Sequence, residues 1–337
     1  MAAARASSYS IRRCFMPDLA LARTPRRVTS HAPPTVSVCI PVYNGAGSIS
    51  RSIDSVLAQT YDDFECIVVD NNSTDKTIQR VLSYSDPRIR IVRNGRNLGM
   101  VGNHNRCASV ARGRLIQFLH ADDWLLPNCL ATLVPAFDDD NVGLAFAPRR
   151  VITTDESWSA RFGRLEDQLR PLRPVNNGAE LIRRYLAAGA DGNPIGEPTS
   201  VMLRRETLLA AGGFRRQVPQ LQDIDAWLRM LTRCDAAFIE DELTVRWHHA
   251  GTATDAFGGT ATLDQMWVLS DLIHSRDLGL SLRLRALGLW WKALARCPKA
   301  VLATPRGLRL ARTRGFAVQT GHLCLGKSLA FKADTYV

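Results

Sequence analysis

The chain has 337 residues, a formal net charge of +11, 46% hydrophobic residues and 22% charged residues. This composition is ordinary for a soluble globular protein, and the length allows a large core or two lobes. No run of about 18 apolar residues occurs, so the sequence predicts no membrane-spanning helix.

The positive charge lies at the two ends of the chain. Residues 1–35 contain six Arg and one Asp, and residues 278–333 contain eleven Lys or Arg and no acid, so residues 36–277 carry about −4. A nucleic-acid binder usually carries its basic patch on the folded domain, so this distribution disfavours nucleic acid as a partner. Basic ends suit an anionic membrane surface, or they are simply solvated. Residues 1–35 are predicted to be a disordered basic arm. They resemble a transit peptide in composition, or the start site is over-extended and the chain begins at Met16.

Eight cysteines are scattered along the chain, and none forms a CxxC pair. Cys39 and Cys66 lie inside apolar runs typical of buried strands. The pattern indicates reduced, buried thiols in a cytoplasmic protein, rather than a disulfide framework or a zinc site.

Three apolar runs each end in a polar cluster. Val36–Ile40 is followed by Pro41–Gly45, Cys66–Val69 by Asp70–Asp75, and the strand at 115–119 by two Asp. Such runs predict strands buried on both faces of a parallel sheet. Open α/β sheets bind ligands beyond the carboxyl ends of their strands, so these loops predict a nucleotide-like ligand.

Strands alternate with helices along the chain, which predicts an α/β fold with a doubly wound, mainly parallel sheet flanked by helices. Further strands are expected at 89–92, 143–147 and 200–203, and 153–177 is expected to be a loop. Helices are expected at 49–58, 74–83, 99–111, 127–137, 179–188, 205–211, 224–234 and 256–277.

Residues 281–297 predict a basic amphipathic helix. Arg285, Lys292, Arg296 and Lys299 form one stripe, and the opposite face carries Leu284, Leu287, Trp291 and Leu294. Two interpretations are open. The apolar face lies in a membrane interface beside the cations, or it packs on the protein's own core.

Six motifs in order resemble the family 2 glycosyltransferases, which have the GT-A fold. They are VSVCIPVYNG through VVDNNSTDKT, NLGMVGNHNRC, QFLHADDW, AAGGF, LQDIDAWLRML and RWHHAGTAT, and they cover about 36–255. The resemblance implies a GT-A domain over 36–255, with a nucleotide-binding half at 36–125 and an acceptor half at 126–255. Residues 256–337 would form a helical basic extension suited to association with a membrane.

The resemblance implies a nucleotide-sugar donor, most simply UDP-linked. Pro41, Tyr43 and Asn44 would line the base pocket, and Asp70 and Asn71 would hold polar edges of the base or ribose. Asn97 and His104 belong to the next motif, His104 near the diphosphate. Asp70 could instead cap a turn, and Tyr43 could simply pack.

A departing diphosphate calls for a divalent cation, Mn²⁺ or Mg²⁺, which prefers carboxylate oxygen. The family motif is usually Asp-x-Asp-Asp, and here His120 occupies its first position. Asp123 is the leading metal ligand, with Asp122 on metal or ribose, and His248 or His249 approaches the metal or diphosphate. The sequence does not separate the two His.

The family's general base is an acid at the start of the WLRL-type helix, where this chain has Asp223. Asp225 is the alternative, and Asp223 could also serve as a helix cap.

The sequence therefore predicts a metal-dependent inverting glycosyltransferase that acts on a saccharide or lipid-linked acceptor in cell-surface polysaccharide or glycolipid synthesis. Its expected location is the cytoplasm, at the inner face of the cell membrane. The alternative is a non-catalytic nucleotide-sugar binder with a degenerate site, which His120 favours.

Overall fold

The computed structural model describes residues 32–156, 158, 164–249 and 261–302, with side chains to residue 296 in the last helix. The chain divides into residues 1–33 and 34–337, and every described element belongs to the second unit. The predicted N-terminal arm and the start of the predicted 256–277 helix lie outside the described residues.

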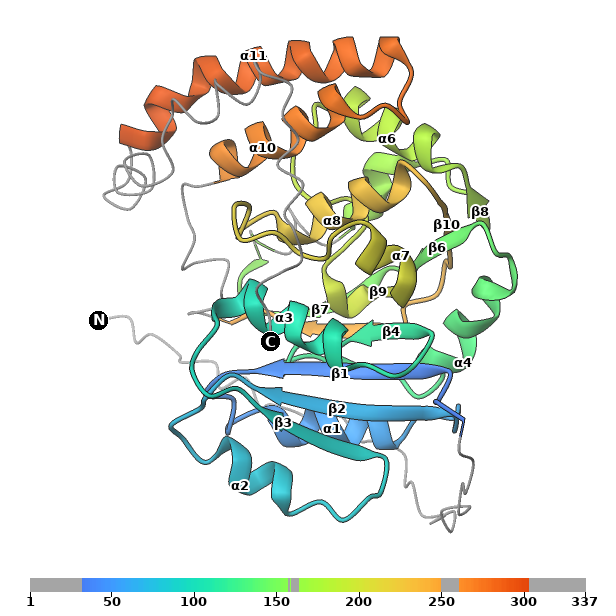
Figure 1. The fold of residues 1–337 in the computed structure, drawn as a ribbon, viewed down its shortest axis with the longest axis vertical. Coiled ribbons are helices and arrows are strands. Elements are labelled where there is room, and N and C mark those ends of the chain that lie inside the picture. Colours follow the sequence, from blue (N-terminus) through green and yellow to red (C-terminus); the bar gives the residue numbers. More distant parts are fainter. Residues whose placement is uncertain (1–31, 157, 159–163, 250–260, 303–337) are drawn as a thin grey trace, which may run out of the picture. The chain divides into compact units, whose positions relative to one another are not determined.

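An eight-stranded, mainly parallel sheet forms the centre of this unit (Figure 1). Its order is β3-β2-β1-β4-β9-β6-β10-β8, and β9 and β8 run antiparallel to their neighbours. The strands are β1 (Val36–Val42), β2 (Phe64–Asp70), β3 (Ile89–Arg93), β4 (Leu115–Phe118), β6 (Val142–Phe146), β8 (Val175–Asn176), β9 (Val201–Arg204) and β10 (Asp235–Phe238).

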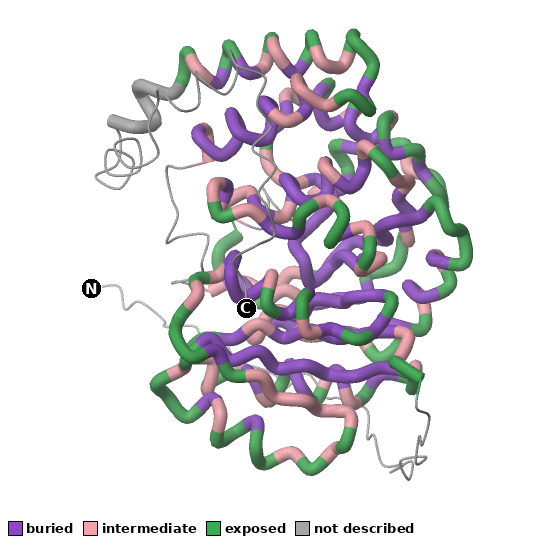
Figure 2. Tube along the Cα trace, viewed as in Figure 1, coloured by how far each residue is buried: buried purple, intermediate pink, exposed green. Residues whose placement is uncertain are grey.

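Alternate residues of the central strands feed two separate cores, because successive side chains of a strand point to opposite faces. On β1, Val38 and Ile40 join one core and Cys39 joins the other. Figure 2 shows the central strands buried almost throughout, whereas the edge strand β3 is mostly of intermediate burial. The near-continuous apolar runs in the sequence are thus explained by helices on both faces.

Helices α1 (Ile49–Leu57), α2 (Thr77–Leu82) and α4 (Cys129–Leu133) cover one face of the sheet. The other core takes side chains from α3 (Gly99–Val110), α6 (Gly178–Ala187), α7 (Arg205–Ala210), α8 (Gln222–Leu231), α10 (Ala261–His274) and α11 (Leu280–Leu302). The predicted α/β class with a helical C-terminal region is confirmed.

Several predicted elements differ in detail. The helix expected at 127–137 is split into α4 and the 3₁₀ segment η1 (Val134–Asp138), because Pro135 cannot donate a hydrogen bond to the preceding turn. The loop expected at 153–177 contains the 3₁₀ segment η2 (Leu165–Leu169) and the edge strand β8. The five cysteines whose side chains the structure describes have free thiols.

A small second sheet was not predicted. It consists of β5 (Trp124–Leu125), β11 (Thr244–Trp247) and β7 (Arg149–Ile152), with β11 in the middle. This sheet brings the residues after Asp123 beside the residues before His248. Strands β7 and β11 escaped prediction because each contains an arginine among its few residues.

Helix α11 contacts the core through a different stripe from the one predicted. Ala286, Trp290 and Ala293 are buried, whereas Leu284 and Trp291 are each 57% exposed. The expectation that the face of Leu284 and Trp291 packs on the protein's own core is therefore wrong for these two residues. None of the described helices is long and apolar enough to cross a membrane.

Four asparagines tie β2, β3 and α3 together at the carboxyl edge of the sheet. The Asn71 amide donates to Asn97 Oδ1 (2.8 Å) and to the Gly99 carbonyl (3.3 Å). Its oxygen accepts from Leu98 N (2.8 Å) and from Asn94, and Asn94 also donates to Asn103. The four hydrogen-bonding positions of the Asn71 side chain are thus all used within the protein.

Asn71→Asp should lower the free energy of unfolding by about 1–3 kcal/mol, because a carboxylate cannot donate and would face two oxygens. Urea unfolding measures the change. The control is Asn72→Asp next to it, where the side chain is exposed and φ is 65°. Asp tolerates that conformation, so a loss within about 0.5 kcal/mol is expected. Equal losses in the two variants would contradict the network.

Trp290 and Trp291 form a matched pair for testing the placement of α11. Trp290 is 1% exposed, and Trp291 is 57% exposed. Trp290→Ala should lower the free energy of unfolding by about 3–5 kcal/mol through loss of buried surface and the cavity left behind. Trp291→Ala should change it by no more than about 0.5 kcal/mol. The reverse ranking in chemical denaturation would refute this orientation of the helix.

Candidate active site

Two loops at the carboxyl ends of β1 and β2 are fastened together. Asn44 adopts a left-handed conformation with φ 53°, and its Oδ1 accepts from Thr74 N at 2.9 Å. Its own N–H donates to Ser73 Oγ at 2.9 Å. Tyr43 projects beside this junction and is 50% exposed, while Pro41 is half-buried within β1. The structure thus brings the predicted base-pocket residues together and leaves an aromatic face open for stacking.

Asp70 ends β2 and is fully buried. Its carboxylate accepts from Ser73 N (3.2 Å) and lies 3.4 Å from Arg93 Nε. Both interpretations of Asp70 stay compatible with this position, since it caps the turn and also lies in the donor-side loop. Asn97 is exposed beside it, whereas Asn71 is committed to the asparagine network.

His104 is buried beneath the site, not on its surface. Its Nδ1 lies 2.9 Å from the Met100 carbonyl, and its ring packs against Phe118, Phe214 and the edge of His120. Burial, with the nearby His120, lowers the pKa of His104 to about 3, so the imidazole is neutral at physiological pH. His104, which was predicted to lie near the diphosphate, is thus a buried, neutral imidazole that packs beneath the site.

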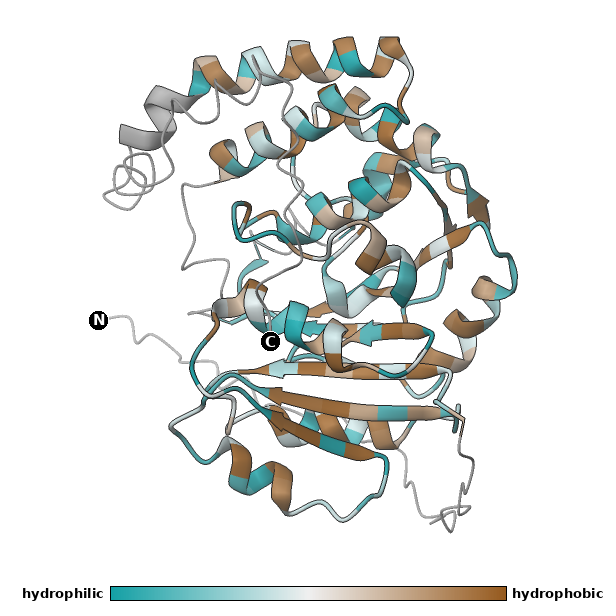
Figure 3. Ribbon diagram, viewed as in Figure 1, coloured by the Kyte–Doolittle hydropathy of each residue, from teal (hydrophilic) through white to brown (hydrophobic). Residues whose placement is uncertain are grey.

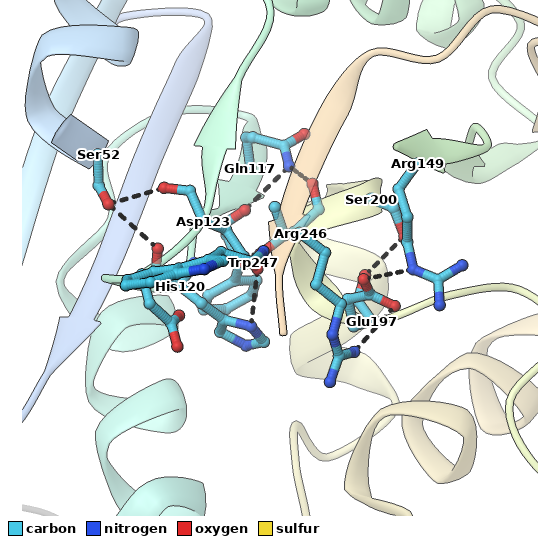
Figure 4. A network of polar contacts seen from close by, with 12 residues as sticks. Ser52, Gln117, His120, Asp123, Arg149, Glu197, Ser200, Arg246 and Trp247 are labelled. Carbon is cyan, nitrogen blue, oxygen red and sulfur yellow. Dashed lines mark hydrogen bonds and ion pairs between the residues drawn. The ribbon is translucent and has the colours of Figure 1, made fainter. Parts of the chain in front are cut away.

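Asp123 is a buried anchor. Its carboxylate accepts from Thr199 Oγ1 (2.9 Å) and from Trp247 N (3.0 Å) and lies 3.5 Å from His120 Nδ1 (Figure 4). Its carbonyl accepts from Ser52 at 2.7 Å. Despite burial, which opposes it, Asp123 raises the pKa of His120 and favours the imidazolium. Both oxygens of Asp123 are therefore already engaged by the protein.

Asp122, the next residue back, faces His249. Asp122 Oδ2 lies 3.5 Å from His249 Nε2, and each side chain remains 38% exposed. Arg51 donates to the Asp122 carbonyl at 3.1 Å, with its guanidinium 4.2 Å from the ring centre of Trp124 and 4.7 Å from that of Trp247. The accessible carboxylate and imidazole thus come from Asp122 and His249.

His248 points elsewhere. Its ring stacks on Trp158 with centres 4.1 Å apart and planes 12° apart, and it is buried. Successive residues of the strand end alternate in direction, so one His packs while the other faces Asp122. The structure thus distinguishes His248, which packs on Trp158, from His249, which faces Asp122. The sequence alone did not distinguish them.

The residues around Glu197 were missed by the sequence analysis. Glu197 is buried between Arg149 of β7 (2.6 Å) and Arg246 of β11 (3.4 Å). Burial disfavours its charge, yet the two arginines hold its pKa at about 2. Asp122 and Asp123 also act on Arg246, so this cluster and the Asp122–Asp123 loop are in electrostatic contact. The signal available in the sequence was an Arg in each of two short segments, Arg149 and Arg246, but these residues lie far apart in the sequence.

Asp223 lies at the start of α8, half-buried. Its Oδ1 accepts from Ile224 N at 2.8 Å, which is the capping role that the sequence allowed. Burial and the charge of Glu197 raise its pKa, despite a hydrogen bond from Asn193. A raised pKa is what a carboxylate needs in order to accept a proton.

Asp225 is buried in an ion cluster instead. Arg215 and Arg229 both contact its carboxylate, Arg229 Nη2 at 2.8 Å. Burial opposes its charge, but the two arginines lower its pKa. Arg215 also forms an ion pair with Asp271 of α10. Asp225 thus holds α8 to its surroundings.

Two contacts fix α8 from outside the helix. Fully buried Asp264 of α10 accepts from Gln220 N (2.7 Å) and Leu221 N (3.2 Å), immediately before the helix. Trp227 of α8 donates to the Gly196 carbonyl at 2.9 Å. Gly196 has φ 115°, and a Cβ there would lie 2.2 Å from Ser200 Oγ. The helix that carries Asp223 and the loop that carries Glu197 are thus joined.

The comparisons with known proteins agree with this geometry. The family described as "Glycosyl transferase family 2" matches residues 37–206. The uncharacterized protein MT1568 of Mycobacterium tuberculosis is 45% identical over 262 residues, 77% of this chain and 82% of that protein. The Escherichia coli protein WfgD, named as a UDP-Glc:α-D-GlcNAc-diphosphoundecaprenol β-1,3-glucosyltransferase, is 36% identical over 36% of this chain and 47% of its own length.

Solved structures share the fold at low sequence identity. TarS 1–349 of S. aureus, in complex with UDP-GlcNAc, superposes with a TM-score of 0.61 at 15% identity, over 87% of this chain and 79% of that one. The mannosyltransferase PcManGT of Pyrobaculum calidifontis, in complex with GDP-Man and Mn²⁺, has a TM-score of 0.53 at 19% identity, over 88% and 86%. With a family match over half of its length and the sheet, loops and acidic residues described above, this chain belongs to glycosyl transferase family 2 and is a glycosyltransferase.

Proposed function

We propose that this glycosyltransferase is metal-dependent and inverting, and that it moves a sugar from a UDP-linked donor to an acceptor hydroxyl. The observation that carries the proposal is the pairing of two partly exposed centres. Asp223 has a raised pKa, and Asp122 faces His249. Glu197 and Arg246 connect them electrostatically. The complex of TarS with UDP-GlcNAc supports a UDP-linked donor. The name of WfgD, a UDP-Glc transferase acting on a diphosphoundecaprenol lipid, supports the same donor class and a role in making a cell-surface product.

The residues present fit a divalent cation. A carboxylate and an imidazole are acceptable ligands for Mn²⁺ or Mg²⁺, which are commonly held by one or two carboxylates together with substrate phosphates. No group of three or more His, Cys, Asp or Glu side chains suited to a metal occurs in the described ranges. We assign Asp122 and His249 as the protein ligands, with the remaining positions left to diphosphate oxygens and water. When bound, the cation would neutralise charge on the leaving diphosphate.

Asp223 is assigned as the general base. The acceptor oxygen attacks C1 of the sugar, the C1–O bond to the diphosphate breaks, and the acceptor proton passes to the Asp223 carboxylate. A single displacement of this kind inverts the anomeric configuration. Tyr43 would stack on the base of the donor, and Asn97, which is exposed, would hold one of its polar edges. The fully buried Asp70 would support the loop through its hydrogen bond from Ser73 N.

Asp223→Asn and Asp225→Asn, on the same turn of α8, separate chemistry from structure. Because the raised pKa of Asp223 disfavours its ionised form in the folded protein, removing the charge should not reduce stability at neutral pH. Turnover should fall by at least about 100-fold. Asp225→Asn should instead lower the free energy of unfolding by about 3 kcal/mol, because two arginines lose their partner.

Sugar transfer and urea unfolding are measured on both variants. Full turnover in Asp223→Asn would rule out this residue as the base. If the wild type showed neither sugar transfer nor donor hydrolysis with Mn²⁺, the non-catalytic alternative would hold.

The pH profile gives an independent check on the base. The reaction needs ionised Asp223, so kcat/KM should fall as pH drops through the pKa of this group. Burial raises that pKa above the ordinary 3.8, so the acidic limb should lie above pH 3.8. The limb should disappear in Asp223→Asn. A limb that persists in this variant would belong to another group.

Asp122→Asn should raise the Mn²⁺ concentration needed for half-maximal donor hydrolysis by at least about tenfold. The matched control is Asp123→Asn, which removes charge from the buried neighbour. It should lower the free energy of unfolding by about 1–3 kcal/mol with a smaller effect on cation affinity. Calorimetric Mn²⁺ titration with UDP present measures affinity. If Asp123→Asn weakened Mn²⁺ binding more than Asp122→Asn did, Asp123 would be the metal ligand.

A further inference from the structure

Helix α11 exposes a second apolar face that the fold does not use. The core takes Ala286, Trp290 and Ala293. Leu280 is 67% exposed, and Leu284 and Trp291 are each 57% exposed. Positions 280, 284 and 291 recur at helical spacing, so these side chains share one face. Trp290 and Trp291 meet edge to face at 5.3 Å, one inside the protein and one outside.

A row of cations borders this apolar face. Arg285, Lys292 and Arg296 are exposed, seven and four residues apart, and each directly follows a member of the exposed face or its continuation at position 295. Arg285 also donates to the Leu186 carbonyl at 3.3 Å, which holds it at the end of α6. Residues 280–302 contain five Lys or Arg and no acid. Figure 3 shows hydrophobic and hydrophilic residues alternating along α11.

We propose that the exposed face of α11, formed by Leu280, Leu284 and Trp291 with the row Arg285, Lys292 and Arg296, binds an anionic lipid bilayer surface. Leu and Trp side chains enter the boundary between headgroups and acyl chains, and the cations contact lipid phosphates. The helix lies along the surface and does not cross it.

Charge decides between this occupant and a second copy of the chain. Pairing two α11 faces would bring cations against cations with no acid on either helix to offset them, and like-charge contact is costly. An anionic bilayer offers both complementary charge and an apolar layer. The contact would hold the enzyme at a surface that carries lipid-linked acceptors. Membrane binding by α11 does not depend on the reaction proposed above.

The test is vesicle flotation of the full chain. Vesicles of phosphatidylcholine with phosphatidylglycerol should bind the protein, and vesicles of phosphatidylcholine alone should bind it far less. Lys292→Gln with Arg296→Gln should weaken partitioning roughly 30-fold, at about fivefold for each surface cation. Leu284→Ser with Trp291→Ser should weaken it as well. Raised salt should lower binding of the wild type, since it screens the cations.

Matched controls carry the same changes elsewhere. Arg106→Gln with Arg112→Gln removes two exposed cations from the end of α3 and the loop after it, and Leu82→Ser removes an exposed Leu from α2. Neither should reduce flotation. The proposal fails if Arg106→Gln with Arg112→Gln reduces flotation as much as Lys292→Gln with Arg296→Gln does. It also fails if both α11 double variants float as the wild type does, because another part of the chain would then bind the bilayer. If the chain did not float at all, or if a dimer dissociated on loss of Trp291, the proposal would also be overturned.

A spectroscopic readout locates the contact. Phospholipids brominated on their acyl chains should quench part of the tryptophan fluorescence of the bound wild type, and Trp291→Ser should remove most of that quenching. Sugar transfer to a water-soluble acceptor should stay unchanged in the α11 variants, because none of these residues belongs to the candidate active site. Unchanged quenching in Trp291→Ser would refute insertion of this face.

Discussion

The buried ion cluster of Glu197 with Arg149 and Arg246 is the constraint on which the site depends. Arg149 comes from β7, Arg246 from β11, and Glu197 from the loop before η3 (Pro198–Ser200), so a single carboxylate joins three segments. The low pKa of Glu197 shows that the attraction of the arginines outweighs the desolvation of the acid. Through β11 the cluster places His249 opposite Asp122, and through the Gly196–Trp227 contact it reaches the helix of Asp223. The proposed donor side and the proposed base side are thus joined by the same interaction.

In each of two pairs of nearby acids, Asp122 with Asp123 and Asp223 with Asp225, one acid is buried and the other is partly exposed. Asp123 and Asp225 are buried, with both of their carboxylate oxygens taken by protein donors. Asp122 and Asp223 remain partly exposed beside them. The inner acid of each pair fixes the backbone, and the outer acid keeps part of its carboxylate accessible, although Asp223 Oδ1 also accepts from Ile224 N. This division is a form of preorganisation, because the accessible carboxylate does not have to be ordered when substrate arrives.

Apart from the short strands β5, β7 and β8, the order of strands and helices from Val36 to Ala211 followed from the sequence, because continuous apolar runs and helical periodicity are local signals. The polar loops at Asn44, Asp70 and Asp122 followed for the same reason. What could not be predicted depends on contacts between distant segments. Strands β7 and β11 contain arginines that look solvent-facing until Glu197 is placed between them. Likewise, spacing shows that α11 has two apolar faces, but only its contacts with α6 and α10 decide which one is buried.

His120 makes the charge of this site differ from that of the usual family motif. Where relatives carry a first Asp, this chain has an imidazole whose pKa is raised, against the effect of burial, by Asp123 and Asp122. The substitution removes one negative charge and adds positive character, so the protein alone attracts a cation less strongly than an Asp-x-Asp-Asp site would. In the proposed cation site, the diphosphate would therefore supply more of the ligands, which would couple cation binding to the presence of donor. The ion pair also consumes Asp123 internally, since His120 lies 3.5 Å from its carboxylate. With Asp123 engaged in this way, Asp122 is the acid of this motif that remains partly exposed.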